Sequence, residues 1–484
     1  MVAPRVRATL CLVALTSPSG CAAGEQASPE PRRSGPEERL SIVLVSLDTT
    51  RADRIGAYGG PAGLTPNLDR FAAESVVFTE AFSQATVTGP SHASLLTSRY
   101  PTEVYGDGNT ATTGDAPLLA TILRAYGYRA GAFVSGGALA PECGLTAGFE
   151  VYVSPTNFGS LAQTVPLALG WLGTTGRDSP TLTFIHGYDA HAPTPKAPPY
   201  AGTPPSPLAA HALHTWSARL LDGRLHESPF DYSTVERRFA QPRSPEARAA
   251  LRALDPAAPP LTPADLDRIR TSYNDAVSWS DVWFGALMVG LQEQGRLDDT
   301  VIIVLSDHGE QLGEEGLFDH CCGADDPETH VPLMIRVPGA PPRTVNGLVE
   351  LVDVLPTIVD LAGAVQPAGA RGRSLRAALE GDPWVGRDVA WTQGGHDYTV
   401  TSGRTARGRL TWTDTNAVAT ADAVERAPLD APAFSGFGVD REQVRTAMAA
   451  WLRTLVPAAD QGRTTLSPDL VQDLRAHGYF GAGQ

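Results

Sequence analysis

The clearest pattern along the chain is a set of short, continuous apolar runs. Residues 41–47 (SIVLVSL) and 300–305 (TVIIVL) are rich in β-branched side chains, and neither run alternates regularly with polar positions. Such runs are typical of strands buried on both faces of a parallel sheet. Two further runs, 128–134 and 181–186, are interpreted as strands as well.

Helical periodicity accompanies these strands. Residues 118–126 fit a helix, and residues 262–291 carry apolar side chains at helical spacing, which we interpret as core positions and which include Tyr273. Thr262-Pro263 is a good helix start, because the hydroxyl can cap the helix and proline suits its first position. Gly295 is a suitable stop.

Two other parts of the chain differ in composition and in the pattern of apolar residues. Residues 193–262 are rich in Pro and Ala, and we interpret them as an irregular insertion at the rim of a site, where such segments often set substrate choice. From about residue 386 the segments DVAWTQ, DYTVTSG and RLTWTD alternate like antiparallel strands. A final helix is expected from Pro468 onward.

The N-terminus is typical of an export signal. Within residues 1–21, arginines precede a short apolar run, and Cys21 follows a Ser-Pro-Ser-Gly stretch that resembles a bacterial lipoprotein cleavage site. The run is too short to span a bilayer. Residues 22–39 are polar and rich in Pro, Glu and Arg, and are expected to form a disordered tether. We therefore expect an exported bacterial protein, either periplasmic or anchored to the membrane by a lipid on Cys21.

Composition narrows the class of function. The chain has 484 residues, 42% of them hydrophobic, so it can bury a large core. Its net charge is 38 − 53 = −15. An acidic chain is a poor general partner for nucleic acid, although it can hold an anionic substrate at a local metal site. Cys143, Cys321 and Cys322 remain outside the signal, and a bridge from the first to one of the other two is left open. The sequence carries no indication of an oligomeric state.

Candidate metal ligands follow the two strongest strand signals. Asp48 comes directly after the first apolar run, and Asp307 and His308 follow the run that ends at residue 305. In open α/β sheets, ligands bind just beyond the carboxyl ends of the strands. His191 follows a third strand signal at a similar place.

A candidate nucleophile lies in the segment 86–98 (TVTGPSHASLLTS), where a turn leads into a helix. Pro90 suits a first helical position, which places Thr88 at the mouth of the helix. Free backbone N–H groups and the helix dipole favour an anion there. A hydroxyl in that place can attack a phosphate or sulfate ester; the alternative is that Thr88 only caps the helix.

Four segments resemble the sulfatase family of the alkaline phosphatase superfamily. TGPSHASLLT at 88–97 is similar to the signature C/S-x-P-S-R-x-x-x-L-T, and LDTTRADRIGAYGG at 47–60 is similar to the common sulfatase opening. SDHGE at 306–310 and HVPLMIRVPG at 330–339 resemble the second metal-binding segment, in which the phosphonate hydrolase and phosphodiesterase branches have Asp-His.

The resemblance implies a fold and a division of the chain. The expected fold is α/β and alkaline-phosphatase-like, with a mostly parallel central sheet flanked by helices and a smaller C-terminal antiparallel-sheet subdomain. A sulfatase-like catalytic domain would cover residues 40–385, including the insertion, and an α+β subdomain would cover residues 386–484.

The resemblance also implies roles for individual residues. The expected metal ligands are Asp48, Thr88, Asp307 and His308, and the expected substrate contacts are His320 and His92. The expected catalytic groups are the nucleophile Thr88 and His191, which could act as leaving-group acid or as oxyanion donor; His320 is the alternative acid. Two carboxylates, an imidazole and a hydroxyl oxygen suit Zn²⁺ or Mn²⁺, and Ca²⁺ or Mg²⁺ less well.

The chain departs from the family pattern at diagnostic points. Thr88 replaces the Cys or Ser that becomes formylglycine, and threonine lacks the primary carbon that this oxidation needs, so no formylglycine is expected. Threonine nucleophiles occur in the phosphodiesterase and lipoteichoic acid synthase branches of the superfamily. His92 replaces the signature Arg, and residues 135–139 lack the family's Lys and His.

These features favour a metal-dependent hydrolase or transferase of phosphate, phosphodiester or phosphonate esters. One alternative is a sulfuric ester hydrolase that works without formylglycine, and another is a non-catalytic binding protein that kept the fold. A second metal, bound by Asp189 with His191 or involving His330, is left open.

Overall fold

The computed structural model describes residues 39–106, 110–111, 116–191, 263–314, 318–320, 323–394, 398–413, 419–431, 433–457, 467, 469–470 and 472. The predicted export signal, the insertion at 193–262 and most of the predicted final helix lie outside these ranges. No helix within the described ranges is long and apolar enough to cross a membrane.

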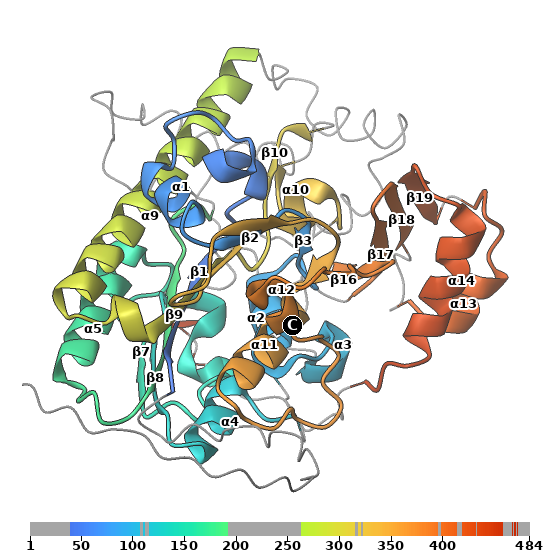
Figure 1. Cartoon of the computed structure of the whole chain (residues 1–484). Coiled ribbons are helices and arrows are strands. Elements are labelled where there is room, and N and C mark those ends of the chain that lie inside the picture. The colour runs from blue at the N-terminus through green and yellow to red at the C-terminus, as the bar shows by residue number, and fades with distance from the viewer. Residues whose placement is uncertain are drawn as a thin grey trace, which may run out of the picture.

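A mostly parallel sheet forms the centre of the molecule (Figure 1). Within the described ranges, eight strands lie in the order β14-β2-β13-β9-β1-β8-β6-β7. In chain order these strands are β1 (Ser41–Leu47), β2 (Val76–Phe78), β6 (Arg129–Phe133), β7 (Val151–Val153), β8 (Thr181–Gly187), β9 (Thr300–Leu305), β13 (Leu333–Arg336) and β14 (Arg343–Val345). The strand β13 runs antiparallel to β9 and β2, whereas β1, β6, β7, β8 and β9 are mutually parallel. The four strands predicted from apolar runs are confirmed as β1, β6, β8 and β9.

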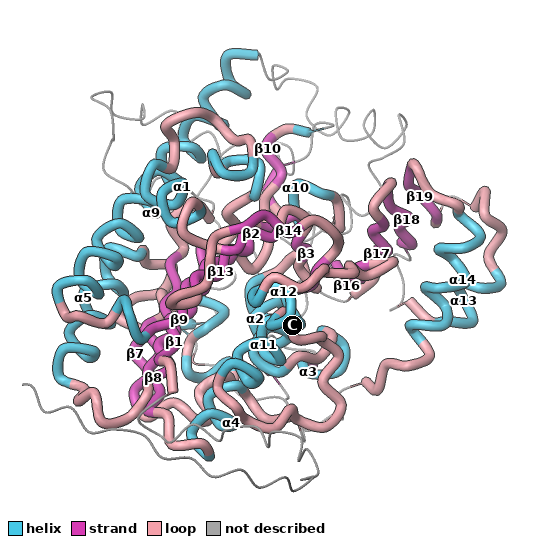
Figure 2. Tube along the Cα trace, in the orientation of Figure 1, coloured by secondary structure: helices cyan, strands magenta, loops and turns pink. Residues whose placement is uncertain are grey.

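Helices cover both faces of this sheet, as Figure 2 shows for α5 and α9 on one side and for α2 and α11 on the other. The first layer contains α1 (Pro66–Ala72), α5 (Leu161–Thr174) and α9 (Pro263–Glu293), and the second contains α2 (Thr88–Thr97), α4 (Leu119–Ala125), α11 (Val354–Leu361) and α12 (Arg376–Glu380). Val43, Val45 and Leu47 of β1 pack in the first layer, and Ile42 and Leu44 pack in the second. Successive side chains of a strand point to opposite faces, so a strand between two helical layers is apolar at nearly every position.

The predicted helices are confirmed as α4 and α9. The long helix α9 ends before Gly295, which has a φ of 65°. The backbone N–H of Arg296 then bonds back to the carbonyl of Leu291. Glycine adopts this left-handed conformation without a Cβ penalty, which explains the stop at this position.

Short elements complete the main body. They are β3 (Ala81–Phe82), β12 (His330–Val331) and β15 (Val349–Glu350) in one small sheet, the pairs β10 (Gln311–Leu312) with β11 (Phe318–Asp319) and β4 (Tyr105–Gly106) with β5 (Thr110–Ala111), and the helices α3 (Pro101–Val104) and α10 (Asp326–Thr329).

A second, antiparallel sheet follows, as the alternation in the sequence predicts. Its strands in the described part of the chain are β16 (Ala390–Gly394), β17 (Val400–Thr405), β18 (Gly408–Thr413) and β19 (Phe434–Phe437), accompanied by α13 (Ala421–Arg426) and α14 (Arg441–Leu452). Leu410, Trp412 and Phe434 of this sheet pack with Val444 and Met448 of α14. The predicted fold class is therefore confirmed, while the domain boundary near residue 385 stays a prediction.

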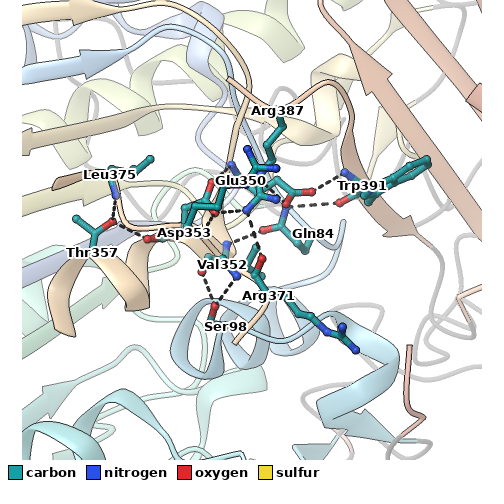
Figure 3. A network of polar contacts seen from close by, with 12 residues as sticks. Gln84, Ser98, Glu350, Val352, Asp353, Thr357, Arg371, Leu375, Arg387 and Trp391 are labelled. Atoms are coloured by element: carbon teal, nitrogen blue, oxygen red, sulfur yellow. Dashed lines mark hydrogen bonds and ion pairs between the residues drawn. The ribbon is translucent and has the colours of Figure 1, made fainter. Parts of the chain in front are cut away.

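A buried ionic network joins the two parts of the protein (Figure 3). The guanidinium of Arg387 lies 3.0 Å from Glu350 Oε2 and forms a second ion pair with Asp353, and both carboxylates are fully buried. Glu350 Oε1 also accepts a hydrogen bond from the backbone N–H of Trp391 in β16, at 2.7 Å. Gln84 bridges the same region, because its Oε1 accepts from Val352 N at 3.0 Å and its backbone carbonyl accepts from Gln393 N of β16 at 2.9 Å. The segment that precedes α2 is thus tied to the antiparallel sheet.

Replacing Arg387 by Ala should destabilise the protein strongly, because it leaves two buried carboxylates without their cation. The expected loss is about 3–5 kcal/mol of unfolding free energy. The matched control is Arg376→Ala, which removes exposed ion pairs with Glu380 and Asp360 and should cost less than about 1 kcal/mol. Urea unfolding of both variants measures this difference, and equal midpoints would contradict the network's role.

Cys143 is a free, buried thiol in the described part of the chain, whereas Cys321 and Cys322 lie outside it. The sulfur contacts the carbonyl of Gly137 at 3.8 Å, and burial raises the pKa of the Cys143 thiol to about 12.

A thiol with so high a pKa stays protonated at pH 8 and should react slowly with a disulfide reagent. In a Cys321→Ser, Cys322→Ser protein without residues 1–38, we expect almost no reaction with Ellman's reagent in the native state and one thiol per chain in 6 M guanidinium. Rapid reaction in the native state would show that Cys143 is accessible.

Candidate metal centre and nucleophile

The carboxyl ends of neighbouring parallel strands meet in this site. Ser46 of β1 is in register with His186 of β8 and with Leu305 of β9, so the residues that follow β1 and β9 emerge side by side. Asp48 and Asp307 are these residues, as the strand-end rule predicts. The backbone N–H of Thr49 donates to Asp307 Oδ1 at 3.2 Å, which links the two strand ends directly.

One oxygen of Asp48, one oxygen of Asp307 and one nitrogen of His308 lie within 4.8 Å of one another, and all three residues are buried. This Asp–Asp–His group can hold a metal ion. Thr88 lies beside it: its Oγ1 is 3.2 Å from Asp48 Oδ2 and 3.3 Å from His308 Nε2. The structure therefore brings together the four residues that the sequence proposes as metal ligands.

The charge state of Asp307 suits a cation. Burial acts to raise the pKa of Asp307, but the charges of His308, His92 and His186 outweigh it and hold that pKa below its usual value. Its Oδ2 accepts no hydrogen bond from any described residue, although it lies 3.4 Å from His308 Nε2. A buried anionic oxygen without a hydrogen bond is expected where a cation binds. The donor set of two carboxylates, an imidazole and a hydroxyl fits a divalent metal.

Thr88 is the first residue of α2, two positions earlier than the start expected from Pro90. The first N–H groups of a helix have no partner within it, so a proline is tolerated at the third position. The residue before the helix is Val87, which is extended and offers no capping side chain. The helix therefore begins at the predicted nucleophile, and the dipole at this end favours an anion.

The side chain of His92 faces the protein interior. Its Nδ1 lies 2.8 Å from the carbonyl of Thr88, which can only accept, and its Nε2 lies 2.9 Å from Ser46 Oγ. Burial lowers the pKa of His92 to about 4, so the ring is neutral near pH 7. Since both nitrogens are used, the geometry disagrees with the substrate contact expected for His92 and supports a role in holding the backbone of Thr88.

His186 is a site residue that our sequence reasoning missed. Its Nε2 lies 2.9 Å from Asp48 Oδ2, the same oxygen that Thr88 contacts. Its backbone carbonyl accepts a hydrogen bond from Ser135 Oγ at 2.8 Å, in the segment that lacks the family's Lys and His. A histidine at the end of an apolar run, followed closely by Asp189 and His191, was the signal available in the sequence.

His191 and His320 lie next to each other and next to the metal group. Their ring centroids are 4.7 Å apart, and the centroid of His320 is 4.6 Å from that of His308. Two histidines that are distant in sequence thus meet in the segments that follow β8 and β11.

Neither candidate for a second metal gains support. Asp189 Oδ2 accepts a hydrogen bond from the N–H of Leu161, the first residue of α5, at 2.9 Å. His330 lies on β12, where its Nε2 is 2.9 Å from the carbonyl of Thr79 and its ring stacks on Phe82. These contacts are those of a helix cap and of a structural histidine.

Comparison with known proteins agrees with this geometry. The sulfatase family profile matches residues 41–364. The chain belongs to the sulfatase family.

Several relatives can be compared with this sulfatase-family protein. It is 27% identical over 418 residues to the multifunctional alkaline phosphatase superfamily protein of Trinickia caryophylli, covering 71% of this chain and 78% of that protein. It is 28% identical over 429 residues to steryl-sulfatase of Mus musculus, covering 73% of this chain and 67% of that protein. The crystal structure of the phosphonate monoester hydrolase of Agrobacterium radiobacter has a TM-score of 0.62 at 20% identity and covers 86% of this chain and 95% of that one. The last similarity shows the fold alone.

Replacing Gly89 by Ala should disturb the start of α2, because a Cβ there would lie 2.2 Å from the hydroxyl oxygen of Tyr105, a buried side chain. We expect a loss of about 1–3 kcal/mol in unfolding free energy from this overpacking. Gly170→Ala in α5 is the matched control, since its Cβ would meet nothing within 4 Å and should stabilise the helix by about 0.5–1 kcal/mol. Urea unfolding that ranks the two variants equally would contradict the close contact.

Proposed function

We propose that the protein is a metal-dependent hydrolase of phosphate, phosphodiester or phosphonate esters that uses Thr88 as its nucleophile. The observation that carries this proposal is the position of Thr88 Oγ1, 3.2 Å from Asp48 Oδ2 and 3.3 Å from His308 Nε2. A threonine that served only as a helix cap would have no reason to lie against a buried group of metal-ligand type.

The residues divide the work of the first step. A divalent cation held by Asp48, Asp307 and His308 would supply a Lewis acid that favours the alkoxide of Thr88 and neutralises the ester oxygens. Asp48 Oδ2 accepts the hydrogen bond of the Thr88 hydroxyl and is the nearest base for its proton. Thr88 Oγ1 then attacks phosphorus in line, the bond to the leaving oxygen breaks, and a phosphothreonine forms. His92 holds the carbonyl of Thr88 in place during this attack.

We assign departure of the leaving group and binding of the substrate to the two histidines beside the metal group, His191 and His320. His191 is the proposed acid that protonates the leaving oxygen, and His320 is the proposed substrate contact, consistent with rings 4.7 Å apart. Water, or an acceptor alcohol in a transfer reaction, then attacks phosphorus and releases Thr88. Backbone N–H groups at the start of α2 add donors to the same anion.

The charge of the site favours one class of phosphorus ester. Two carboxylates, from Asp48 and Asp307, balance the charge of a divalent cation, and the buried ring of His92 is neutral. A site with little net charge binds a monoanion more readily than a dianion, because each uncompensated buried charge is costly. Phosphodiesters and phosphonate monoesters are monoanions near neutral pH, so we propose them above phosphate monoesters.

A sulfuric ester is the second candidate, and the match to the sulfatase family favours it. Sulfate monoesters are monoanions too, so charge does not separate them from diesters. The two candidates differ at the reacting centre, because Thr88 excludes the formylglycine route.

The test is hydrolysis by the chain without its first 38 residues. Nitrophenyl esters of phosphate, phenyl phosphate, phenylphosphonate and sulfate are offered with Zn²⁺, Mn²⁺ or Ca²⁺. We expect the phosphorus monoanions to turn over fastest, Thr88→Ala to lower turnover at least about 10³-fold, and Thr88→Ser to keep part of it.

Thr97→Ala is the control for this experiment, since Thr97 is buried at the other end of α2, where it bonds only the carbonyl of Ala93 in the described structure. Full turnover by Thr88→Ala would remove Thr88 from the mechanism. Turnover of the sulfate ester alone would support the second candidate, and bound metal without turnover of any ester would support a non-catalytic binding protein. Export and the lipid on Cys21 stay predictions, because these residues lie outside the described ranges.

A further inference from the structure

The turn between Asp48 and Arg51 contains a strained residue. Thr49 has a φ of 54°, in the left-handed region that β-branched residues avoid. It is fully buried, and its Oγ1 makes no hydrogen bond with any described residue, so its side chain does not stabilise this conformation through a polar contact. Backbone strain of this kind persists only where the surrounding structure holds it.

The left-handed conformation of Thr49 directs its N–H towards the residue that follows the neighbouring strand β9. Thr49 directly follows Asp48, and its N–H points at Asp307 Oδ1, 3.2 Å away. The same carboxylate oxygen accepts the N–H of His308 at 2.9 Å, which leaves Oδ2 turned towards the metal group. The left-handed residue therefore sets how Asp307 presents its second oxygen and how far it lies from Asp48.

A single hydroxyl closes this turn from outside. Tyr273 Oη donates to the carbonyl of Thr49 at 2.6 Å and accepts from the N–H of Arg51 at 3.0 Å. Tyr273 lies on α9 and packs in a small buried cluster with Ala190, Val277 and Leu312. The hydroxyl thus bonds the backbone on both sides of Thr50. Tyr273 itself is held by the long helix α9.

The far side of the turn is anchored as well. Arg51 Nη1 donates to the carbonyl of Glu310 at 3.0 Å, in the loop that follows His308. The turn after β1 and the loop after β9 are therefore linked directly. Tyr273 on α9 bonds the turn after β1, while Ser91 of α2 bonds the carbonyl of Asp307 after β9 at 2.7 Å.

We propose that Tyr273 is a positioning residue that holds Thr49 in its left-handed conformation and thereby sets the separation of the metal-binding carboxylates. This inference rests on the metal site of the proposed function. It assigns a role to a residue that periodicity alone places in the core.

The test compares two tyrosine hydroxyls. Tyr273→Phe removes the clamp, and Tyr58→Phe is the matched control, because Tyr58 Oη makes the same pair of backbone bonds to Leu333, donating to its carbonyl at 2.9 Å and accepting from its N–H at 2.8 Å. Calorimetric titration with Mn²⁺ and with Zn²⁺ measures binding, and urea unfolding of the metal-free proteins measures stability. We expect Tyr273→Phe to bind both metals about 10–100-fold more weakly than wild type, as is typical when a group that orients metal ligands is removed, while Tyr58→Phe binds normally.

A rescue variant separates positioning from general damage. Glycine adopts a φ near 54° without strain, so Thr49→Gly in the Tyr273→Phe background should recover much of the lost affinity. Equal metal affinity of the two phenylalanine variants, or no recovery in the double variant, would overturn the positioning role. The Asp307→Asn variant tests the metal site itself, because it removes a proposed ligand. If it binds metal as tightly as wild type does, the metal site is overturned and this inference with it. If only the Tyr273 comparison fails, the metal site stands and the positioning role alone is overturned.

Discussion

Parallel register at one edge of the central sheet is the constraint on which the site depends. Because β8, β1 and β9 are adjacent and parallel, their carboxyl ends deliver His186, Asp48 and Asp307 to one place without any loop having to reach across the molecule. The rest of the site is fitted to this edge. The helix α2 brings Thr88 to it, and the turn at Thr49 adjusts the distance between two neighbouring strand ends. A rigid edge of this kind suits chemistry in which one ion must lie between fixed oxygens.

Much of this arrangement could be predicted from the sequence, and the reasons are local. Apolar runs identify buried strands, and the residues just beyond them identify Asp48, Asp307 and His308 as ligand candidates. The proline turn predicted only a helix start near Thr88, and the resemblance of residues 88–97 to the sulfatase signature made Thr88 a candidate nucleophile. The continuous apolar character of β1 predicted a strand buried on both faces of a parallel sheet. The alternation of apolar and polar residues after residue 386 predicted the antiparallel sheet.

What could not be predicted depends on which way a side chain points and on what it meets there. His92 matched a substrate-binding position in the motif, but on the actual helix its ring turns inward to Ser46. His186 is the last residue of an apolar run, and the run does not show that its ring contacts Asp48. Tyr273 was correctly placed in the core by its spacing, yet periodicity describes a face and not the partner of a hydroxyl group. These contacts join residues 46, 138 and 224 positions apart, and no local pattern encodes them.

The attachment of the antiparallel sheet to the segment before α2 has a consequence for the order of folding. The N–H of Gln393 bonds the carbonyl of Gln84, and the hydroxyl of Thr392 bonds the carbonyl of Ser83, across 309 positions of the chain. The segment leading into α2 is made early in synthesis, but its backbone partners emerge only when most of the chain is complete. Contacts of such long sequence separation form slowly, since a large loop must close before they can stabilise anything. A nascent chain therefore carries the segment that leads into α2 well before the antiparallel sheet that holds it has been synthesised, so this attachment is expected to form late in folding.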